Sequence, residues 1–218
     1  MALSPTQFLL QVIFPAGRTI RSGWEDREVK SRLESVLEHG SSLGLAGVYV
    51  NLLHGLGLSN EKLLGIAFVH DLHEPHTHDP SPFRLYYVGS KRIDKVSFFE
   101  RLTDFVDGWR DWEVRFRDSD RQAMWEITNP MAPAVRRLFR RWWRWYHGRR
   151  TPEAKLLNQL HALADGAKGI DYLSAKENEG MHSIDSFFEQ AEETVKSPLL
   201  RPYIEEQQRL KEVISAHN

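Results

Sequence analysis

The sequence predicts an all-α fold, and three observations support this prediction. Apolar residues recur at helical spacing in several long segments. Residues that favour helix N-termini precede these segments, and Pro or Gly stands at their ends. The clearest strand-like stretch, residues 85–88, is short and equally suits an extended loop. We therefore expect a single helical domain over residues 1–218, with an insertion or lid at residues 83–118.

Composition narrows the class of protein. The 218 residues are 41% hydrophobic and 27% charged, which is typical of a soluble globular protein with a sizeable core. The formal net charge of −1 provides no attraction to nucleic acid or membranes, so neither is an expected partner. The absence of Cys excludes disulfides and thiolate catalysis. Since no apolar run approaches the ~20 residues that cross a bilayer, and no secretory signal is evident, we expect a cytoplasmic location.

The N-terminal region is expected to hold one short helix and a loop. The helix covers residues 3–14, and Pro15 and Gly17 end it. The loop over residues 18–24 carries Arg and Trp side chains. They could cover the edge of the core, or reach an anionic ligand that contains a ring.

A long helix is expected over residues 31–53, where apolar and small residues alternate at helical spacing. Ser35 or Glu34 is placed to cap its start. Its small residues allow close contact with another helix. His39 lies on this helix, and a lone His in such a position is more often a core residue than a ligand.

The next helix, residues 61–72, is strongly apolar and is expected to be central. Gly55 and Gly57 precede it, and Ser59 is a good N-cap. Pro75 stops the helix soon after its end. The helix therefore delivers its last polar residues to the inside of the protein.

The middle of the chain contains aromatic and basic residues in a regular pattern. Residues 97–109 and 119–147 are expected to be helical, and the second segment breaks near Asn129 and Pro133. Its last part has an apolar face of Val135, Leu138, Phe139, Trp142, Trp143 and Tyr146, and an Arg face of Arg136, Arg137, Arg140, Arg141 and Arg144. The pattern fits a basic surface for nucleic acid or anionic lipid. Its regular period favours a core helix whose Arg face is solvated.

Three further helices complete the chain. Thr151 is placed to cap the first, with Pro152 at its first position. The second is expected over residues 183–195, and the third, a polar helix, over residues 202–216.

The central helix ends in the most informative stretch of the sequence. His70 and Asp71 stand side by side, and four His and three acidic residues lie between His70 and Asp79. Buried polar side chains without partners cost several kcal/mol, so something must satisfy them. Imidazole and carboxylate groups suit a divalent cation, and a metal site is therefore one explanation.

With these elements in place, the chain resembles the HD-domain phosphohydrolases, and among them the 5′-deoxynucleotidase branch. Four segments carry the resemblance in family order: residues 20–24 (Ile-Arg-Ser-Gly-Trp), 34–39 (Glu-Ser-Val-Leu-Glu-His), 70–82 (His-Asp-Leu-His-Glu through Asp-Pro-Ser-Pro) and 151–161 (Thr-Pro-Glu-Ala-Lys-Leu-Leu-Asn-Gln-Leu-His). The resemblance implies an all-α helical bundle, a homodimer and one divalent metal ion.

The resemblance also implies which residues hold the metal. His39, His70 and Asp71 match the first three ligands of the family, and His161 stands where the family has an Asp. Asp165, one turn later, is the alternative ligand. A set with His161 is less anionic by one charge, which shifts the expected preference toward Zn²⁺, Co²⁺, Fe²⁺ or Mn²⁺ over Mg²⁺.

Further residues match the catalytic and substrate-binding positions of the family. Glu74 matches a catalytic acid, which would orient or deprotonate a water, or protonate the leaving oxygen. Asp79 matches a residue near the sugar and the leaving group. Arg21 would bind the phosphate as a fork-shaped cation. Trp24 would lie against the base or the sugar.

The expected function is that of a metal-dependent phosphoric monoester hydrolase, which removes the 5′-phosphate from deoxynucleoside or nucleoside monophosphates. One alternative is hydrolysis of another phosphate ester or of a nucleoside triphosphate. A second is a binding or regulatory module with a degenerate site, in which the Arg-rich helix contacts a partner. The replacement of the family Asp by His161 supports this second alternative.

Overall fold

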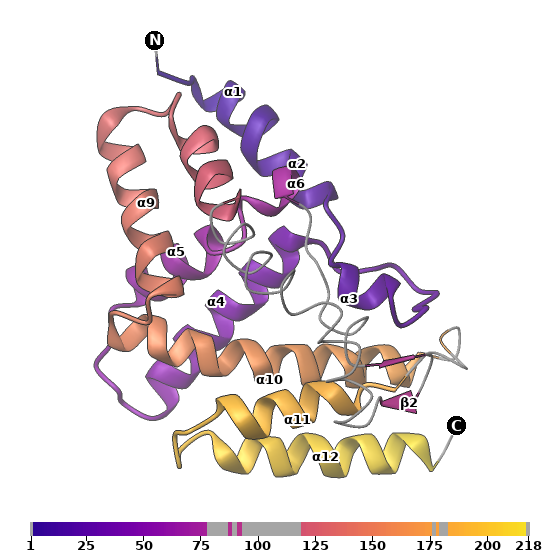
Figure 1. Cartoon of the computed structure of the whole chain (residues 1–218). Helices are drawn as coiled ribbons and strands as arrows, with labels where there is room; N and C mark the ends of the chain where they lie inside the picture. The colour runs from indigo at the N-terminus through magenta and orange to yellow at the C-terminus, as the bar shows by residue number, and fades with distance from the viewer. Residues whose placement is uncertain are drawn as a thin grey trace, which may run out of the picture.

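Helices form nearly all the regular structure in the part of the chain that the computed structural model describes. These are residues 2–77, 87–88, 91–92, 119–175, 178 and 183–216. The strands among them are β1 (Tyr87–Val88) and β2 (Lys91–Arg92), which pair antiparallel. The predicted all-α class is confirmed (Figure 1).

The N-terminal helix continues further than the sequence indicated. Helix α1 (Pro5–Phe8) leads into a π-helical segment (Leu9–Ile13), and α2 (Phe14–Arg18) follows without a break. The prediction that Pro15 ends the helix is therefore wrong. The π-helical segment precedes α2, so Pro15 lies in the first turn of α2. Backbone N–H groups in the first turn have no partner within the helix, and the missing N–H of proline therefore costs no hydrogen bond there. Helix α3 (Ser22–Glu25) follows.

Two capped helices form the centre of the fold. Helix α4 (Val36–Leu53) begins after Ser35, whose hydroxyl accepts a hydrogen bond from the Glu38 amide, so the predicted Ser35 cap is confirmed. The predicted start at residue 31 is wrong, because Ser35 pairs with Ile20 as an extended residue. Helix α5 (Asn60–Val69) begins after Ser59, which caps it as predicted, and it ends three residues earlier than residue 72.

Close contact between α4 and α5 depends on Gly40. A Cβ at Gly40 would lie 2.9 Å from the carbonyl oxygen of Ala67, which is closer than real Cβ contacts. A Cβ at Gly47 would lie 2.9 Å from Cδ2 of Leu157, on the helix that crosses nearby. The small residues predicted to allow close helix contact therefore do so, and His39 is brought beside the end of α5.

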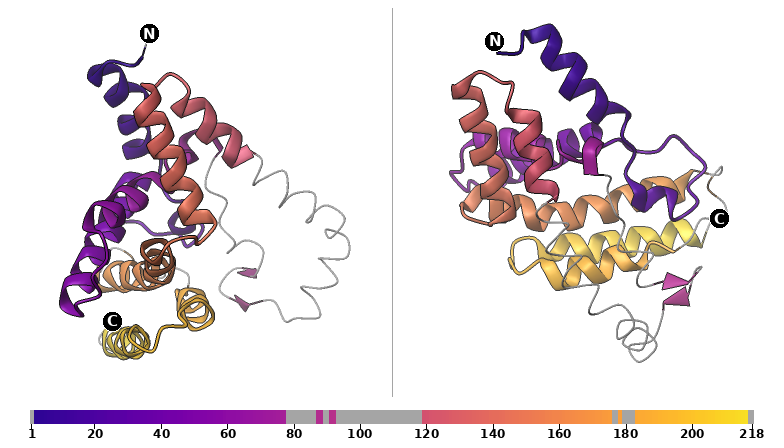
Figure 2. Two further views of the ribbon diagram at one scale, coloured as in Figure 1. Left: turned by 90° about the vertical axis from the view of Figure 1, so that its left-hand side faces the viewer. Right: turned by 45° about the horizontal axis from the view of Figure 1, so that its top comes forward.

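The second half of the chain adds a layer of three helices. They are α10 (Pro152–Ser174), α11 (Asp185–Thr194) and α12 (Arg201–Ser215), and they lie side by side in both views (Figures 1 and 2). Thr151 caps α10 as predicted, because its hydroxyl accepts a hydrogen bond from the Ala154 amide. Helices α10 and α11 begin within two residues of their predicted starts.

The Arg-rich segment forms α9 (Pro133–His147), after a helix at residues 119–128. The predicted break near Asn129 and Pro133 is confirmed. Trp143 and Tyr146 are buried, which supports the interpretation of α9 as a core helix. Arg140 donates to the Thr128 hydroxyl and lies over the ring of Trp125, so at least one Arg helps to hold the two helices together.

Some predictions concern residues outside the described part of the chain. The short helix α6 (Glu74–Thr77) is the last element before the proposed insertion at residues 83–118. Only residues 87–88 and 91–92 of that insertion are described, so its extent and the helix at 97–109 stay predictions. No helix among the described residues combines the length and the apolar character that crossing a membrane requires.

Candidate metal centre

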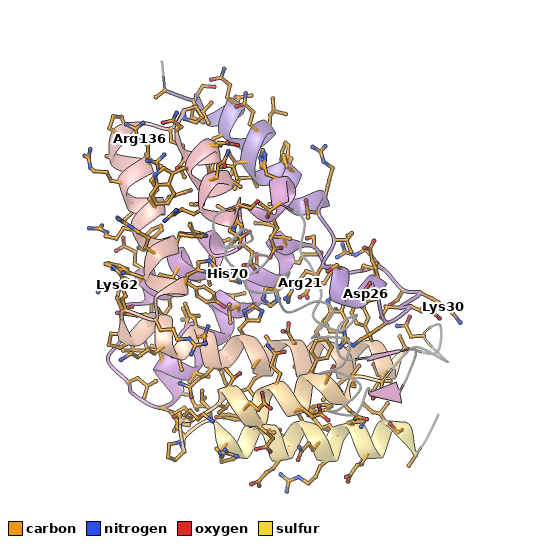
Figure 3. All side chains as sticks on the ribbon, viewed as in Figure 1. Arg21, Asp26, Lys30, Lys62, His70 and Arg136 are labelled. Carbon is orange, nitrogen blue, oxygen red and sulfur yellow. The ribbon has the colours of Figure 1, made fainter. Side chains whose placement is uncertain are left out.

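Three histidines from three helices meet in the interior. They are His39 on α4, His70 directly after α5, and His161 on α10. One ring nitrogen of each lies within 4.8 Å of those of the other two, the only such group of metal-binding side chains among the described residues. His39 and His70 are each 1% exposed. Figure 3 labels His70 and Arg21 in the middle of the molecule, next to the crossing of these helices.

Two carboxylates border this group. Oδ2 of Asp71 lies 2.8 Å from Nε2 of His70. Oδ2 of Asp165 lies 3.5 Å from Nε2 of His161, and its Oδ1 lies 4.0 Å from Nδ1 of His39. The structure thus groups three of the ligands that the resemblance implies and places the fourth, Asp71, beside His70, while the alternative ligand Asp165 lies beside His161 and His39.

The ring of His70 is oriented for a ligand at Nε2. Its Nδ1 lies 2.6 Å from the carbonyl oxygen of Ala67, which can only accept, so Nδ1 carries a proton. Nε2 of His70 is buried and makes no well-aligned hydrogen bond to any of the described residues. The short distance between Nε2 of His70 and the Asp71 carboxylate is favourable only with a proton or a cation at Nε2. Both observations fit a bound metal ion.

The electrostatics of the group keep its nitrogen atoms available. Burial lowers the pKa of His39 well below 6.5, and Arg21 adds to the effect. Burial lowers the pKa of His161 to about 4, although Asp165 opposes the shift. Burial alone would raise the pKa of Asp71, but His70 outweighs it and holds that pKa well below its usual range. At neutral pH, His39 and His161 are therefore neutral and Asp71 is ionised, the forms that a metal requires.

Arg21 lies among the same side chains. Its Nη1 is 2.7 Å from Nδ1 of His39 and 2.7 Å from Oδ1 of Asp165. Its Nη2 is 3.2 Å from Nε2 of His161. The guanidinium thus provides the positive charge at the candidate ligands in this structure, and an incoming cation would compete with it.

Trp24, the other predicted substrate contact, is part of the core. Its side chain is 1% exposed and packs against Tyr172 and Phe187. Its Nε1 donates to Oε2 of Glu34 over 3.2 Å. The same Glu34 oxygen lies 3.7 Å from Nδ1 of His39. In this conformation Trp24 supports the centre through Glu34 and offers no open face to a base.

The predicted catalytic acid, Glu74, is buried at the start of α6, one turn beyond His70. Its charge is the smallest of the effects that raise the pKa of Tyr146, after burial, Asp71 and Asp165. Asp79 lies outside the described residues, so its role stays a prediction.

Tyr146 was not identified as a site residue from the sequence. Its hydroxyl oxygen lies 2.5 Å from Nδ1 of His161, and its ring centroid lies 4.6 Å from that of His70. The apolar spacing of α9 placed Tyr146 only in the core. A buried Tyr requires a partner for its hydroxyl, which was the one available signal.

Comparison with known proteins identifies what this arrangement resembles. A family model described as an HD domain matches residues 18–201. Two solved structures are similar: a conserved hypothetical protein from Pyrococcus furiosus, with a TM-score of 0.61 and 21% identity, and the PH0347 protein from Pyrococcus horikoshii OT3, with a TM-score of 0.61 and 22% identity. Each likeness covers 94% of this chain and 99% of the other, and it shows the shared fold. The comparison with curated proteins gives no match.

Proposed function

The chain belongs to the HD domain family, and on that premise we propose that it removes the 5′-phosphate from deoxynucleoside monophosphates. Membership of the family indicates a metal-dependent hydrolase. The observation that carries the proposal is the group formed by the buried His39 and His70 and the half-buried His161, with Asp71 at its edge. The 5′-deoxynucleotidase activity itself rests on the sequence motifs that contain these residues.

The donor set indicates which metals to expect. Three imidazoles and one carboxylate suit Zn²⁺, Co²⁺, Fe²⁺ or Mn²⁺ better than Mg²⁺, which prefers oxygen ligands. When bound, such an ion lowers the pKa of a water ligand and polarises a phosphate oxygen.

The side chains around the centre would divide the remaining tasks. Arg21 would bind the phosphate, because a guanidinium offers paired N–H donors to its oxygens. Glu74 would orient the water and move a proton to or from it, or to the leaving 5′-oxygen. Asp79 would lie near the sugar. The cytoplasmic location and the homodimer are also proposals, and light scattering during gel filtration would test the second.

Metal content is the first test of this function. We expect near-stoichiometric divalent metal in the purified protein and its loss in His161→Ala, because that variant removes one of the neutral donors. Elemental analysis of both proteins measures this directly. The loaded wild type should then release phosphate from deoxynucleoside 5′-monophosphates faster than from 3′-monophosphates or triphosphates.

Each failure has a defined meaning. If the wild type holds no metal after reconstitution with Zn²⁺, Co²⁺ or Mn²⁺, the proposed hydrolase function is wrong. The degenerate binding module then becomes the better description, and the position of Arg21 among the ligands supports it. If metal is present but another phosphate ester is hydrolysed faster, the proposed metal centre is supported and the proposed substrate is wrong.

Replacing Arg21 by Met should have opposite effects on metal binding and on catalysis. Two unit charges 4 Å apart interact by about 4 kcal/mol at an effective dielectric constant of 20, and 1.4 kcal/mol is already tenfold in affinity. We therefore expect the dissociation constant for Zn²⁺ to fall by about tenfold or more. The KM for the monophosphate should rise, because the phosphate loses its guanidinium. Competition with a chromogenic chelator and steady-state kinetics measure the two effects.

Arg27→Met is the matched control for that experiment. Arg27 is a buried arginine that donates to the Gly23 carbonyl and the Ser186 hydroxyl and lies over the ring of Phe187. Its loss should reduce stability and leave Zn²⁺ affinity unchanged. Weaker Zn²⁺ binding in Arg21→Met would contradict the inferred competition between guanidinium and metal.

A further inference from the structure

The contact between Tyr146 and His161 joins α9 to α10 at the candidate metal centre. The Tyr146 hydroxyl oxygen and Nδ1 of His161 are 2.5 Å apart. Tyr146 is buried, so its hydroxyl depends on the surrounding side chains for a hydrogen-bond partner. A hydroxyl can accept from Nδ1 or donate to it, so the direction of this bond must come from the other side of the ring.

Arg21 determines that direction. A guanidinium only donates hydrogen bonds, and Nη2 of Arg21 lies 3.2 Å from Nε2 of His161. Nε2 must therefore present its lone pair to Arg21. In the neutral ring the proton is then on Nδ1, and Nδ1 donates it to the Tyr146 oxygen. The reverse arrangement would point two donors, the N–H of Nε2 and that of Arg21, at each other.

His70 shows the same arrangement with a different partner. Its Nδ1 donates to the carbonyl oxygen of Ala67 over 2.6 Å, and its Nε2 faces the centre. Two of the three histidines thus carry the proton on the nitrogen that points away from the other ligands. For His70 the partner is its own backbone, whereas for His161 it is a side chain that another helix supplies.

We propose that Tyr146 is a positioning residue that holds His161 in the Nδ1–H tautomer and so presents the lone pair of Nε2 to a metal ion. The proposal rests on the metal centre of the proposed function and deepens it. A histidine that ligates through Nε2 must be free of a proton there, and the group bound to the other ring nitrogen sets that tautomer. Asp165 offers the opposite tautomer, because its carboxylate lies 3.5 Å from Nε2 of His161 and could accept a proton there. Tyr146 opposes that tautomer by accepting the Nδ1 proton, and it does so together with Arg21, whose donor faces Nε2.

The test compares Tyr146→Phe with Tyr203→Phe. The first variant removes only the hydroxyl that contacts His161. The second removes a similar contact elsewhere, because the Tyr203 hydroxyl lies 2.9 Å from Nε2 of His54. The first readout is the pair of ¹⁵N chemical shifts of the His161 ring in metal-free protein at pH 7.5, assigned by the signals that His161→Gln lacks. The second is the dissociation constant for Zn²⁺ from chelator competition.

We expect the Nδ1–H tautomer of His161 in the wild type and in Tyr203→Phe, and a shift toward the Nε2–H tautomer in Tyr146→Phe. Loss of such a supporting contact typically weakens metal binding by about 10- to 100-fold, and we expect a loss of that size for Tyr146→Phe alone. The proposal is overturned if wild-type His161 is in the Nε2–H form, a result that needs no variant to fold. It is also overturned if Tyr146→Phe keeps the wild-type tautomer and Zn²⁺ affinity.

These readouts separate the positioning role from the hydrolase. Neither requires turnover, so a protein that binds Zn²⁺ but hydrolyses no nucleotide would overturn the proposed function and still support the role of Tyr146. A wild type that binds no Zn²⁺ would overturn both.

Discussion

Glu74→Gln should keep the metal and lose most of the catalysis. A general acid or base contributes about 10²- to 10⁴-fold to a rate, and we expect a fall of that size in kcat. Glutamine preserves the size and much of the hydrogen bonding of glutamate but can neither take up nor release the proton. Because Glu74 is not among the grouped histidines, the metal content should match that of the wild type. Elemental analysis and phosphate release on the same samples measure both quantities.

Glu153→Gln provides the comparison. Glu153 is also a buried glutamate at the start of a helix, but it lies near the amide of Ser59 and the ammonium of Lys62. Its replacement should lower stability without lowering kcat. Full activity in metal-loaded Glu74→Gln would exclude Glu74 as the proton-transfer residue and leave Asp79 as the candidate.

The pH dependence of kcat is an independent test of the role of Glu74 in proton transfer. If Glu74 acts as a base, the acid limb of the wild-type profile should disappear in the variant, because the group that titrates there has been removed. A wild-type acid limb that persists in Glu74→Gln would have to belong to another group.

Those features of the fold that depend on neighbouring residues could be predicted from the sequence. Ser35, Ser59 and Thr151 cap the helices that follow them because each hydroxyl bonds an amide three residues later. One exception is Pro15, where a π turn moved the proline into the start of a new helical segment. A single extra residue in a turn leaves no mark in the hydrophobic pattern.

The candidate site also combines features that the sequence predicts with features that it does not. His70 and Asp71 were found because they are adjacent, and His39 and His161 because of the resemblance. Spacing could not show that the Arg21 guanidinium reaches His39 and Asp165, the second of which is 144 positions away. It also could not show that Tyr146 directs its hydroxyl at His161, since the helical period distinguishes only a core face from a solvent face. These features depend on how helices cross, which a single sequence does not encode locally.

The metal-free protein should lose stability steeply as the pH falls from 7.0 to 4.5. The pKa of His161 is about 4 in the folded protein because of burial, and it is about 6.5 in an unfolded chain. Within this interval the unfolded state binds the proton and the folded state does not, so stability decreases as the pH falls. Each pKa unit corresponds to about 1.4 kcal/mol, so His161 alone contributes a loss of about 3 kcal/mol. The pKa of His39, lowered well below 6.5, adds a loss of the same sign.

That loss is large compared with the total of about 5–15 kcal/mol that stabilises a typical domain. Urea unfolding in the presence of a chelator at pH 7.0 and 4.5 measures it. Other groups contribute over the same interval, since burial raises the pKa of Glu34 and this opposes the effect of the histidines. The total change in unfolding free energy therefore cannot be assigned to one residue. Only the difference between the wild type and a variant isolates the contribution of His161.

His161→Gln isolates the contribution of the centre. Without the titrating ring, the change in unfolding free energy between pH 7.0 and 4.5 should be smaller than in the wild type by about 3 kcal/mol. His54→Gln, which removes a histidine that contacts Tyr203 outside the centre, should leave that change close to the wild-type value. Equal pH dependence in the wild type and His161→Gln would mean that the folded protein accepts a proton at His161 as readily as the unfolded chain. The loss of stability over this interval would then come from other groups, such as His39, whose pKa burial also lowers.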